Sequence, residues 1–494
     1  MSPRFSKSLL RLYFLCAFFA LGSFVWGYNI GILATIYTNA GFKKALHKPT
    51  ASKTGLITAI YYLGTWLSYI FLSHPASDYL GRRYACLVGM LTTCFGAALQ
   101  TGATGSGALA MMVIGRIFCG LGIAIVSTAV PTYQSEVAPA RHRGRYVVMN
   151  HIGLTTGIAV AFWVGYAVTF WKGTKGFNYG WRMSIALQFI PATIFMLGLP
   201  FVPETPRWLI QHGQLERGRK SLHYFRVGSY TESEIDDEFE SIKLKAELEH
   251  AENNSWTQLF ARRDLFERLW RAALLQFMAQ MCGATAMKYY LPQLFNKLGI
   301  GHPLSLLISG VESTLKIGCT IIEMFLIDMI GRRATMLGGI TVMFFAMLIN
   351  GALPLAYPNQ SNHASDYTCI VFIFFYTFGY SVSFGPAAWV YGSEIFPTNF
   401  RARGLNFAAS GGAIGSIIVA QAWPVGIQNI GSKTYFIFMA INLVCLPVIY
   451  FLYPETSRKS LEGLSELFDR KSVHSVSSVD EAEIEHQSQA PKAV

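Results

Sequence analysis

Long apolar stretches alternate with short polar ones along most of the chain. Twelve of these stretches approach the length of about 20 residues that a helix needs to cross a bilayer. They begin near Tyr13, Thr54, Tyr84, Leu109, Tyr146, Met183, Trp270, Leu304, Ala334, Tyr367, Leu405 and Tyr435. The first follows Arg4, Lys7 and Arg11 and is longer than the core of a cleaved signal peptide, so we expect it to remain as a spanning helix. The pattern predicts an all-α membrane protein with twelve transmembrane helices.

Two polar segments interrupt this pattern and set the expected domain boundaries. The first separates two sets of six predicted helices, and the second forms the end of the chain. The expected units are an N-terminal half at 1–202, a central loop at 203–268, a C-terminal half at 269–453 and a tail at 454–494. The tail is rich in Ser, Glu and Gln, which is typical of disorder.

The central loop carries signs of amphipathic helices. Thr231 and Glu234 have the spacing of a capping box. Apolar residues then recur at helical spacing, at Ile235, Phe239, Ile242 and Ala246. We expect these helices to pack against the membrane domain; a partner-binding role is the alternative.

The composition is that of a chain in contact with lipid. Of its 494 residues, 52% are hydrophobic and 14% are charged, against roughly 25% charged in a soluble globular chain. The net charge of +12 comes from short basic runs beside apolar segments, which favours lipid head groups over a nucleic-acid partner. Arginine pairs fall in alternate loops, on the same side as both termini, so that side should be the cytoplasm. Lys43, Lys44 and Lys48 lie on the opposite side and are an exception to this rule.

The sequence lacks the motifs of an enzyme or a metalloprotein. The eight cysteines form no CxxC pair and lie mostly in apolar segments, as small core or lipid-facing thiols do. No phosphate-binding GxxxxGK[ST] loop and no nucleophile elbow occurs. We therefore expect no enzymatic activity, no cofactor, no metal site and no transport driven by ATP.

An internal repeat divides the chain into two related halves. The pattern Asp-x-x-Gly-Arg-Arg occurs at residues 78 and 328, Ser-Glu-x-x-Pro at 135 and 393, and Pro-Glu-Thr at 203 and 454. The three patterns keep their order, and each returns after about 250 residues. Parallel six-helix halves of this kind are a transporter arrangement.

The repeated charged residues are candidates for a gate at the cytoplasmic face. Acidic and arginine side chains at helix ends can pair in one conformation and separate in another. The alternative is that the arginines only keep their loops inside, although that rule does not require acidic partners. The candidate gate residues are Asp78, Arg82, Arg83, Arg116, Glu136, Arg143, Asp328, Arg332, Arg333, Glu394 and Arg401.

With these motifs the chain resembles the sugar porter family of the major facilitator superfamily, in a fungal type. Further matching residues are Gly115-Arg116, Pro131-x-Tyr133, Arg143-Gly144, Pro203-Glu204-Thr205-Pro206-Arg207-Trp208-Leu209, Gln276, Gln280, Tyr289-Tyr290-x-Pro292, Gly385-Pro386, Trp389 and Pro454-Glu455-Thr456. The resemblance covers nearly the whole chain. It implies two six-helix halves, cytoplasmic helices in the central loop, and alternating access to a site between the halves.

The resemblance also implies a substrate site near the membrane midplane. The family's binding positions fall on His151, Gln276, Gln280, Thr285, Lys288, Lys316 and Trp389. Both glutamines and Trp389 keep the family's residue type, whereas Gly412-Ala413 replaces its Asn-Trp pair. Much of the sugar-binding set is therefore changed.

Two lysines and a histidine are unusual at such a depth. An ionisable side chain inside a membrane is costly and is a functional candidate by default. Glu312 lies four residues before Lys316, the favourable order for a helix ion pair, and Glu323 follows it on roughly the same face, so neutralisation is the alternative for Lys316. Lys288 has no such neighbour in sequence, which favours a role in the pocket. His151 is either a substrate ligand or a hydrogen-bonded residue on a pore-lining face.

These observations predict a secondary transporter for a sugar or a sugar-like polyol. One alternative, favoured by the lysines, is an organic or sugar acid (quinate-like or a uronate) or a fungal secondary metabolite. A non-transporting nutrient sensor is another, against which the short tail argues. Proton-coupled members of the family carry Asp after Gly-Tyr in the first span, where this chain has Asn29. Transport is then facilitative, or protons use Glu312, Glu323 or His151.

The expected partners are a small-molecule substrate, the lipid bilayer and, if transport is coupled, protons. We expect a monomer in the plasma membrane with both termini in the cytoplasm. Asn359 begins a glycosylation motif in a predicted outer loop. Asn253 has the same motif on the predicted cytoplasmic side and should stay unmodified.

Overall fold

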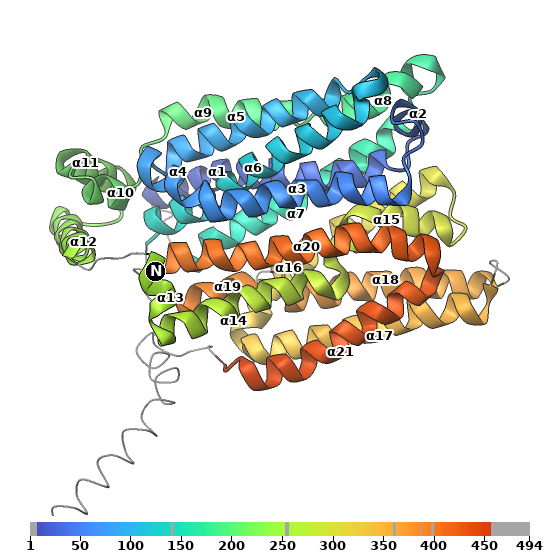
Figure 1. Cartoon of the computed structure of the whole chain (residues 1–494). Helices are drawn as coiled ribbons and strands as arrows, with labels where there is room; N and C mark the ends of the chain where they lie inside the picture. Colours follow the sequence, from blue (N-terminus) through green and yellow to red (C-terminus); the bar gives the residue numbers. More distant parts are fainter. Residues whose placement is uncertain are drawn as a thin grey trace, which may run out of the picture.

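The computed structural model describes residues 7–139, 143–251, 256–358, 362–385, 387–396 and 400–455. Within these ranges the regular structure is helical and no β-strand forms. Long helices run side by side as one bundle, and a separate group of helices, α10–α13, lies at one end (Figure 1). We call this the α12 end of the bundle. The opposite end carries the short helix α2 (Ala40–Ala45), and we call it the α2 end.

Each half of the chain supplies six crossings of the bundle. Those of the first half are α1 (Lys7–Ile36), α3 (Ala51–Phe71) with α4 (Ser73–Leu80), α5 (Arg82–Thr101), α6 (Ala108–Val137), α7 (Arg143–Val168), and α8 (Gly173–Ala186) with α9 (Phe189–Gly198). Those of the second half are α14 (Arg263–Ala279) with α15 (Thr285–Lys297), α16 (His302–Ile330), α17 (Arg332–Ala356), α18 (His363–Ser383) with α19 (Ala387–Ile395), α20 (Arg401–Asn429) and α21 (Thr434–Leu452). In Figure 1 the first half, blue to green, lies above the second, yellow-green to red.

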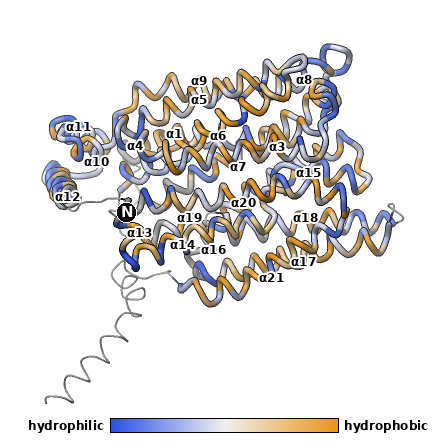
Figure 2. Tube along the Cα trace, in the orientation of Figure 1, coloured by the Kyte–Doolittle hydropathy of each residue, from blue (hydrophilic) through white to orange (hydrophobic). Residues whose placement is uncertain are grey.

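Most crossings are apolar enough to lie in a membrane. Among the described residues ten helices pass on length and composition, and α3 with α4, bent by 50°, makes an eleventh. The twelfth is α14 with α15, which falls short because a break divides it into helices of 17 and 13 residues. Figure 2 shows hydrophobic residues along the bundle and hydrophilic ones gathered at its two ends.

Two crossings begin earlier than the apolar pattern predicts. The sixth begins at Gly173 rather than near Met183, and the seventh at Arg263 rather than near Trp270. Both helices open with a polar turn that extends beyond the apolar core, so hydropathy alone places their starts too late.

Small residues let neighbouring crossings touch at the backbone. A Cβ added to Gly157 of α7 would lie 2.1 Å from the carbonyl oxygen of Phe24 in α1. One added to Gly27 of α1 would lie 1.9 Å from the carbonyl oxygen of Leu154. Such close approach is how helices associate where lipid removes the hydrophobic driving force between them.

The seventh crossing breaks where it meets the centre of the molecule. A π-helical turn, Gln280–Ala284, separates α14 from α15, and Gly283 within it has φ +105°. That conformation strains any residue with a Cβ. Irregular backbone at this depth is tolerated where it lines a cavity, and the break turns the start of α15 toward one.

The helices of the central loop pack partly on one another. They are α10 (Pro206–Gln211), α11 (Leu215–Arg226), α12 (Glu232–Ala251) and α13 (Trp256–Ala261). The capping box of α12 forms as predicted, because the Glu234 N–H donates to Thr231 Oγ1 and the Thr231 N–H donates to the Glu234 carboxylate. The apolar stripe of α12 packs on Ile210 of α10 and Leu222 of α11. The expectation that these helices pack against the membrane domain therefore holds for α11, where Phe225 lies in the bundle core and Arg226 donates to the carbonyl oxygen of Val137, but not for the stripe of α12.

Candidate substrate site and gates

A small cavity lies between the two halves near the middle of the bundle. Its volume is about 20 Å³, room for about one water molecule. Its wall comes from α7 of the first half and α15, α16 and α18 of the second. The lining residues are Ile158, Phe162, Ala284, Met287, Lys288, Leu291, Glu312, Ser313, Lys316, Tyr376, Thr377 and Tyr380.

Both predicted lysines line this cavity. Lys288 Nζ and Lys316 Nζ lie 5.2 Å and 5.4 Å from the centroid of the same ring, that of Tyr380. The face of an aromatic ring attracts a cation but does not neutralise it. Among the described residues neither ammonium group forms an ion pair or a hydrogen bond, so both remain available to a ligand.

Glu312 is held by hydroxyl groups rather than by Lys316. It accepts a hydrogen bond from Ser313 Oγ at 3.1 Å and another from Thr377 Oγ1. The carboxylate stays close enough to Lys316 to interact electrostatically. The structure thus favours a loose charge neighbour over the direct ion pair that the sequence left open.

The remaining predicted binding residues surround the cavity rather than line it. His151 of α7 lies within electrostatic range of both lysines. Thr285 donates to Gln280 Oε1 at 3.1 Å and lies 3.2 Å from Ser416 Oγ of α20. Gln276 is buried where α14 meets α20, next to Gly412. Trp389 packs with Tyr69, Ala124, Ala409 and Ala413, toward the α12 end.

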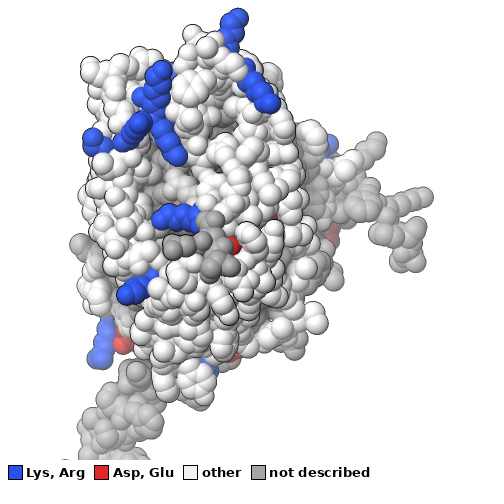
Figure 3. All heavy atoms as spheres, turned by 90° about the vertical axis from the view of Figure 1, so that its right-hand side faces the viewer, with Lys and Arg blue, Asp and Glu red and all other residues white. Residues whose placement is uncertain are grey.

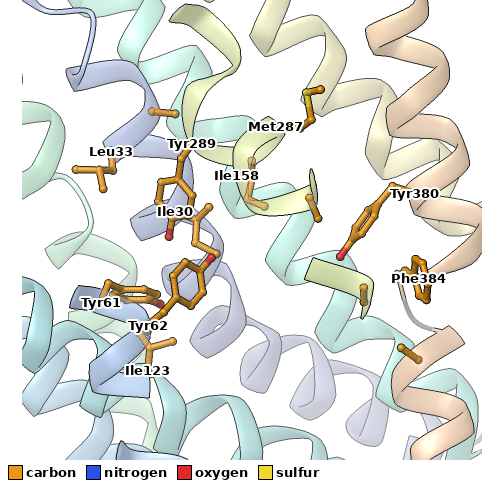
Figure 4. Close-up of a cluster of buried hydrophobic side chains, with 14 of the residues drawn as sticks. Ile30, Leu33, Tyr61, Tyr62, Ile123, Ile158, Met287, Tyr289, Tyr380 and Phe384 are labelled. Atoms are coloured by element: carbon orange, nitrogen blue, oxygen red, sulfur yellow. The ribbon is translucent and has the colours of Figure 1, made fainter. Parts of the chain in front are cut away.

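Tyrosines close the cavity toward the α2 end. The rings of Tyr37, which directly follows α1, and Tyr290 in α15 stack with centroids 5.8 Å apart. The Tyr290 hydroxyl lies 3.0 Å from Thr58 Oγ1 and donates to the carbonyl oxygen of Ala420. Deeper in, Tyr62 and Tyr289 meet edge to face at 6.0 Å, as Figure 4 shows. The contacts of Tyr290 with Tyr37 and Thr58, and that of Tyr289 with Tyr62, join the second half to the first, so opening this exit must break them.

Arg116 does not belong to the gate that the sequence predicted. It lies in the interior of α6, 1% exposed, and donates to Asn29 Oδ1 at 2.6 Å. Its guanidinium stands 4.2 Å from the centroid of the Tyr61 ring. Twenty residues of α6 separate it from Glu136, a distance of about 30 Å along a helix. The sequence placed Arg116 near the start of a span. That span begins at the α2 end, whereas the gate residues lie at the α12 end.

The other first-half gate residues do meet, at the α12 end. Arg82 is 7% exposed and donates to Glu136 Oε1 at 2.9 Å and to the carbonyl oxygen of Ser77. Asp78 lies 3.6 Å away. Thr205 Oγ1 donates to the second oxygen of Glu136 at 2.6 Å. Arg83 points elsewhere and donates to the carbonyl oxygens of Pro200 and Val202.

A buried glutamate holds the turn that presents these arginines. Glu204 accepts from the backbone N–H of Arg83 at 3.0 Å, at the positive end of the α5 dipole. Burial raises the pKa of Glu204, and the N–H groups of Thr205 and Arg83 oppose that rise. Gly81 precedes them with φ +87°, and a Cβ there would lie 2.6 Å from Glu204 Oε2.

The second half repeats this arrangement. Glu455 accepts from the backbone N–H groups of Arg332 and Arg333, each at 2.9 Å, and Gly331 has φ +101°. Arg333 also donates to the carbonyl oxygen of Tyr450. The side chains of the other four gate candidates lie outside the described residues; these are Arg143, Asp328, Glu394 and Arg401.

Sequence reasoning missed several residues of these sites. It noted that Pro-Glu-Thr recurs but gave Glu204 and Glu455 no role, although the repeat was the available signal. It also missed Tyr380, and it named Tyr289 and Tyr290 only as matches to the family, without a role in closing the cavity. One contact that joins the halves at the α12 end, Arg403 Nε to His74 Nε2 at 3.2 Å, had no sequence signal either.

Solved structures share the whole architecture. The proton:xylose symporter XylE, with bound 6-bromo-6-deoxy-D-glucose, matches with a TM-score of 0.78 and 22% identity over 94% of this chain and 100% of that chain. The inward-open form of XylE from E. coli matches with a TM-score of 0.74 and 22% identity, covering 92% and 99% of the two chains. Twelve crossings in two halves thus make up the major facilitator fold.

The family follows from the sequence match. The model described as "Sugar (and other) transporter" matches residues 15–468, and the chain belongs to this family. Similar proteins include the MFS-type transporter criB of Aspergillus cristatus, 31% identical over 96% of both chains. The quinate permease of Neurospora terricola is 29% identical over 96% of this chain and 92% of its own. The high-affinity glucose transporter of Kluyveromyces lactis is 28% identical over 91% and 83%. The chain is a multi-pass transporter and not an enzyme.

Proposed function

We propose that this transporter moves a sugar or sugar-like polyol across the membrane by alternating access. The observation that carries the proposal is the cavity between the halves, closed toward both ends by contacts from one half to the other. Tyr37 with Tyr290 closes it toward the α2 end, and Trp389 with Tyr69 toward the α12 end. Rocking one half against the other would open one exit while the other stays shut.

The cavity wall suits a ligand with several hydroxyl groups. Ser313, Thr377 and Tyr380 line it, and Gln276, Gln280 and Thr285 lie next to it. Such side chains both donate and accept hydrogen bonds, as hydroxyl groups do. At about 20 Å³ the cavity is too small for a sugar, so loading requires the halves to separate.

A hydroxylated organic acid is the second candidate, and the two lysines favour it. A carboxylate placed between Lys288 and Lys316 would gain charge-assisted hydrogen bonds that a neutral sugar makes more weakly. The relatives named above include both a glucose transporter and a quinate permease, so the family accommodates either kind of substrate.

We propose that transport is facilitative, because the first crossing has no side chain that could couple transport to protons at the position of Asn29. Asn29 donates to Gln188 Oε1 at 3.1 Å and accepts from Arg116, and an amide cannot take up a proton at this point. Glu323, fully buried beside the break between α18 and α19, is the rival proton site. Uptake that does not respond to an inward proton gradient supports the facilitative cycle. Stimulation that disappears in Glu323→Gln would assign coupling to Glu323.

Orientation follows from the charge pattern. We propose that the α12 end faces the cytoplasm, that both termini lie there, and that the protein works as a monomer in the plasma membrane. Asn359, outside the described residues, should then carry a glycan. A mobility shift on glycosidase treatment that survives Asn359→Gln would show that another site is used or that the orientation is reversed.

The test of the function is a radiolabelled uptake panel in a host that lacks its own carriers. The panel contains hexoses, pentoses, polyols, uronates and quinate. Saturable uptake of at least one hydroxylated compound supports the proposal. Correct insertion with no uptake of any compound favours the non-transporting sensor.

A further inference from the structure

A wide vestibule opens the molecule at the α2 end. Its volume is about 1230 Å³, and residues from both halves line it. Five of the lining residues are basic: Lys43, Lys44, His47, Lys48 and Lys297. No acidic side chain lines it within the described part of the chain. Figure 3 looks onto this face and shows lysine and arginine side chains around a hollow, with little acidic surface.

The charge of this end departs from the rule that sets membrane topology. Lys43, Lys44, Lys48 and Lys172 lie between crossings at the α2 end, and Lys175 lies in the first turn of α8. Lysines in short loops disfavour transfer to the outer side. With the α12 end in the cytoplasm, these lysines must cross the membrane during insertion, which works against this orientation. A function at the outer face would account for their presence.

The backbone beneath the cluster is strained. His47 and Lys48 have φ of 53° and 54°, a left-handed conformation that residues with a Cβ seldom adopt. The Lys48 N–H donates to the carbonyl oxygen of Lys43 at 2.6 Å, which fixes the turn. Strain of this kind persists where surrounding structure over-determines it, and often at ligand sites. Here it holds two basic side chains at the rim.

The vestibule leads directly to the central lysines. Tyr37 and Tyr290 line its floor and also form the closure above the cavity. Below them lie Lys288 and Lys316, both facing Tyr380. A ligand entering from the α2 end therefore meets positive charge first in the vestibule and again in the cavity.

We propose that the vestibule is an outer binding site for a small hydroxylated organic anion bearing a carboxylate. The anion is held there before the Tyr37–Tyr290 contact opens. This inference rests on the second candidate of the proposed function, the hydroxylated organic acid, because it assigns that substrate class to the same transport path. A concave site lined by one sign of charge focuses the field and raises the local concentration of the opposite charge. Neutral sugars gain nothing from it.

The test compares matched substrates in proteoliposomes of phosphatidylcholine. D-glucuronate and D-glucose differ by a carboxylate in place of a hydroxymethyl group, and quinate and myo-inositol form a second pair. Lys43→Gln with Lys48→Gln removes two charges from the vestibule. Lys172→Gln with Lys175→Gln removes two from the same end, outside the vestibule. Size-exclusion chromatography checks that both variants fold.

The vestibule variant should raise KM for the transported acid about tenfold at low ionic strength, with kcat unchanged. The effect should shrink at about 300 mM salt, where the screening length falls below about 6 Å. The control variant should stay near wild type for every compound.

Three results would overturn the inference. If only the neutral compounds were transported, an anionic substrate would be ruled out, and the proposed transport of a neutral sugar or polyol would stand. An equal effect of the control variant would point to general surface potential. A change that appears only when anionic lipid is added would make the ligand a lipid head group. Uptake of none of the four compounds, nor of any in the wider panel, would instead defeat the proposed function itself.

Discussion

At the scale of single residues, Lys288 and Lys316 are the costliest choices in the chain. A lysine near the bilayer midplane costs roughly 2.5–3.5 kcal/mol on insertion scales. Tyr380 faces both ammonium groups at 5.2 Å and 5.4 Å and offsets part of that cost. Glu312 is already held by Ser313 and Thr377. Two under-compensated cations in one cavity are most simply explained by an acidic group that arrives with the substrate.

Lys288→Met should separate acidic from neutral substrates, because it keeps the bulk and removes the charge. A hydrogen bond to a charged group contributes about 1.5–3 kcal/mol, so kcat/KM for an acid should fall at least about tenfold. A neutral sugar should lose only about two- to threefold. The measurement is competition by acids and by neutral analogues in wild type and variant. Lys53→Met, at the exposed start of α3, is the matched control. Neutral sugars that compete well where acids never do would contradict the acid candidate.

At the scale of elements, glycines set how closely crossings approach. Gly157 in α7 faces the backbone of α1, whereas Gly318 in α16 has nothing within 4 Å of an added Cβ. The same substitution at the two positions should therefore have opposite effects.

Gly157→Ala should lower the melting temperature, because the new methyl forces α1 and α7 apart. Overpacking of this kind costs roughly 1–3 kcal/mol. Gly318→Ala should leave stability unchanged or raise it by about 0.5–1 kcal/mol, since alanine favours a helix interior. Thermal unfolding of the purified protein followed by intrinsic fluorescence measures both. Equal destabilisation by the two variants would mean that backbone contact between α1 and α7 is not limiting.

Sequence alone predicts these elements where a local pattern specifies them. Apolar length predicted the crossings, and the Thr231 capping box predicted the start of α12. The repeat predicted that acidic and arginine side chains pair at helix ends, and Arg82 does meet Asp78 and Glu136. The break at Gly283 and the position of Arg116 could not be predicted in this way. The first depends on backbone geometry, and the second depends on which end of α6 faces the loop that carries Arg82. The pocket positions of both lysines came from the resemblance and remain proposals as binding residues.

At the scale of the whole molecule, the charged cluster at the α12 end couples one half to the other. Arg82 joins Glu136 and Asp78, all within the first half. Asp78 lies 3.2 Å from His74, which in turn lies 3.2 Å from Arg403 of the second half. When the halves separate at this end, the contact between His74 and Arg403 must break, and Asp78 and Arg82 then lose their link to the second half.

Arg82→Ala should slow transport while leaving membrane insertion intact. Within the described residues the variant leaves Glu136, whose side chain is 10% exposed, with one partner, Thr205, so the closed form at this end loses stability. We expect uptake to fall about tenfold or more at normal surface abundance. Arg82→Lys keeps the charge but cannot reproduce the fork of donors and should recover only part of the rate. Unchanged uptake in Arg82→Ala would rule out a gating role for the cluster.

Trans-acceleration in proteoliposomes tests the central claim of alternating access most directly. A carrier whose cavity opens to one side at a time should take up a labelled substrate several-fold faster when unlabelled substrate is already inside. We expect this with at least one compound of the uptake panel, and no acceleration with compounds that fail to compete. Uptake that rises linearly with concentration and ignores internal substrate would contradict the account.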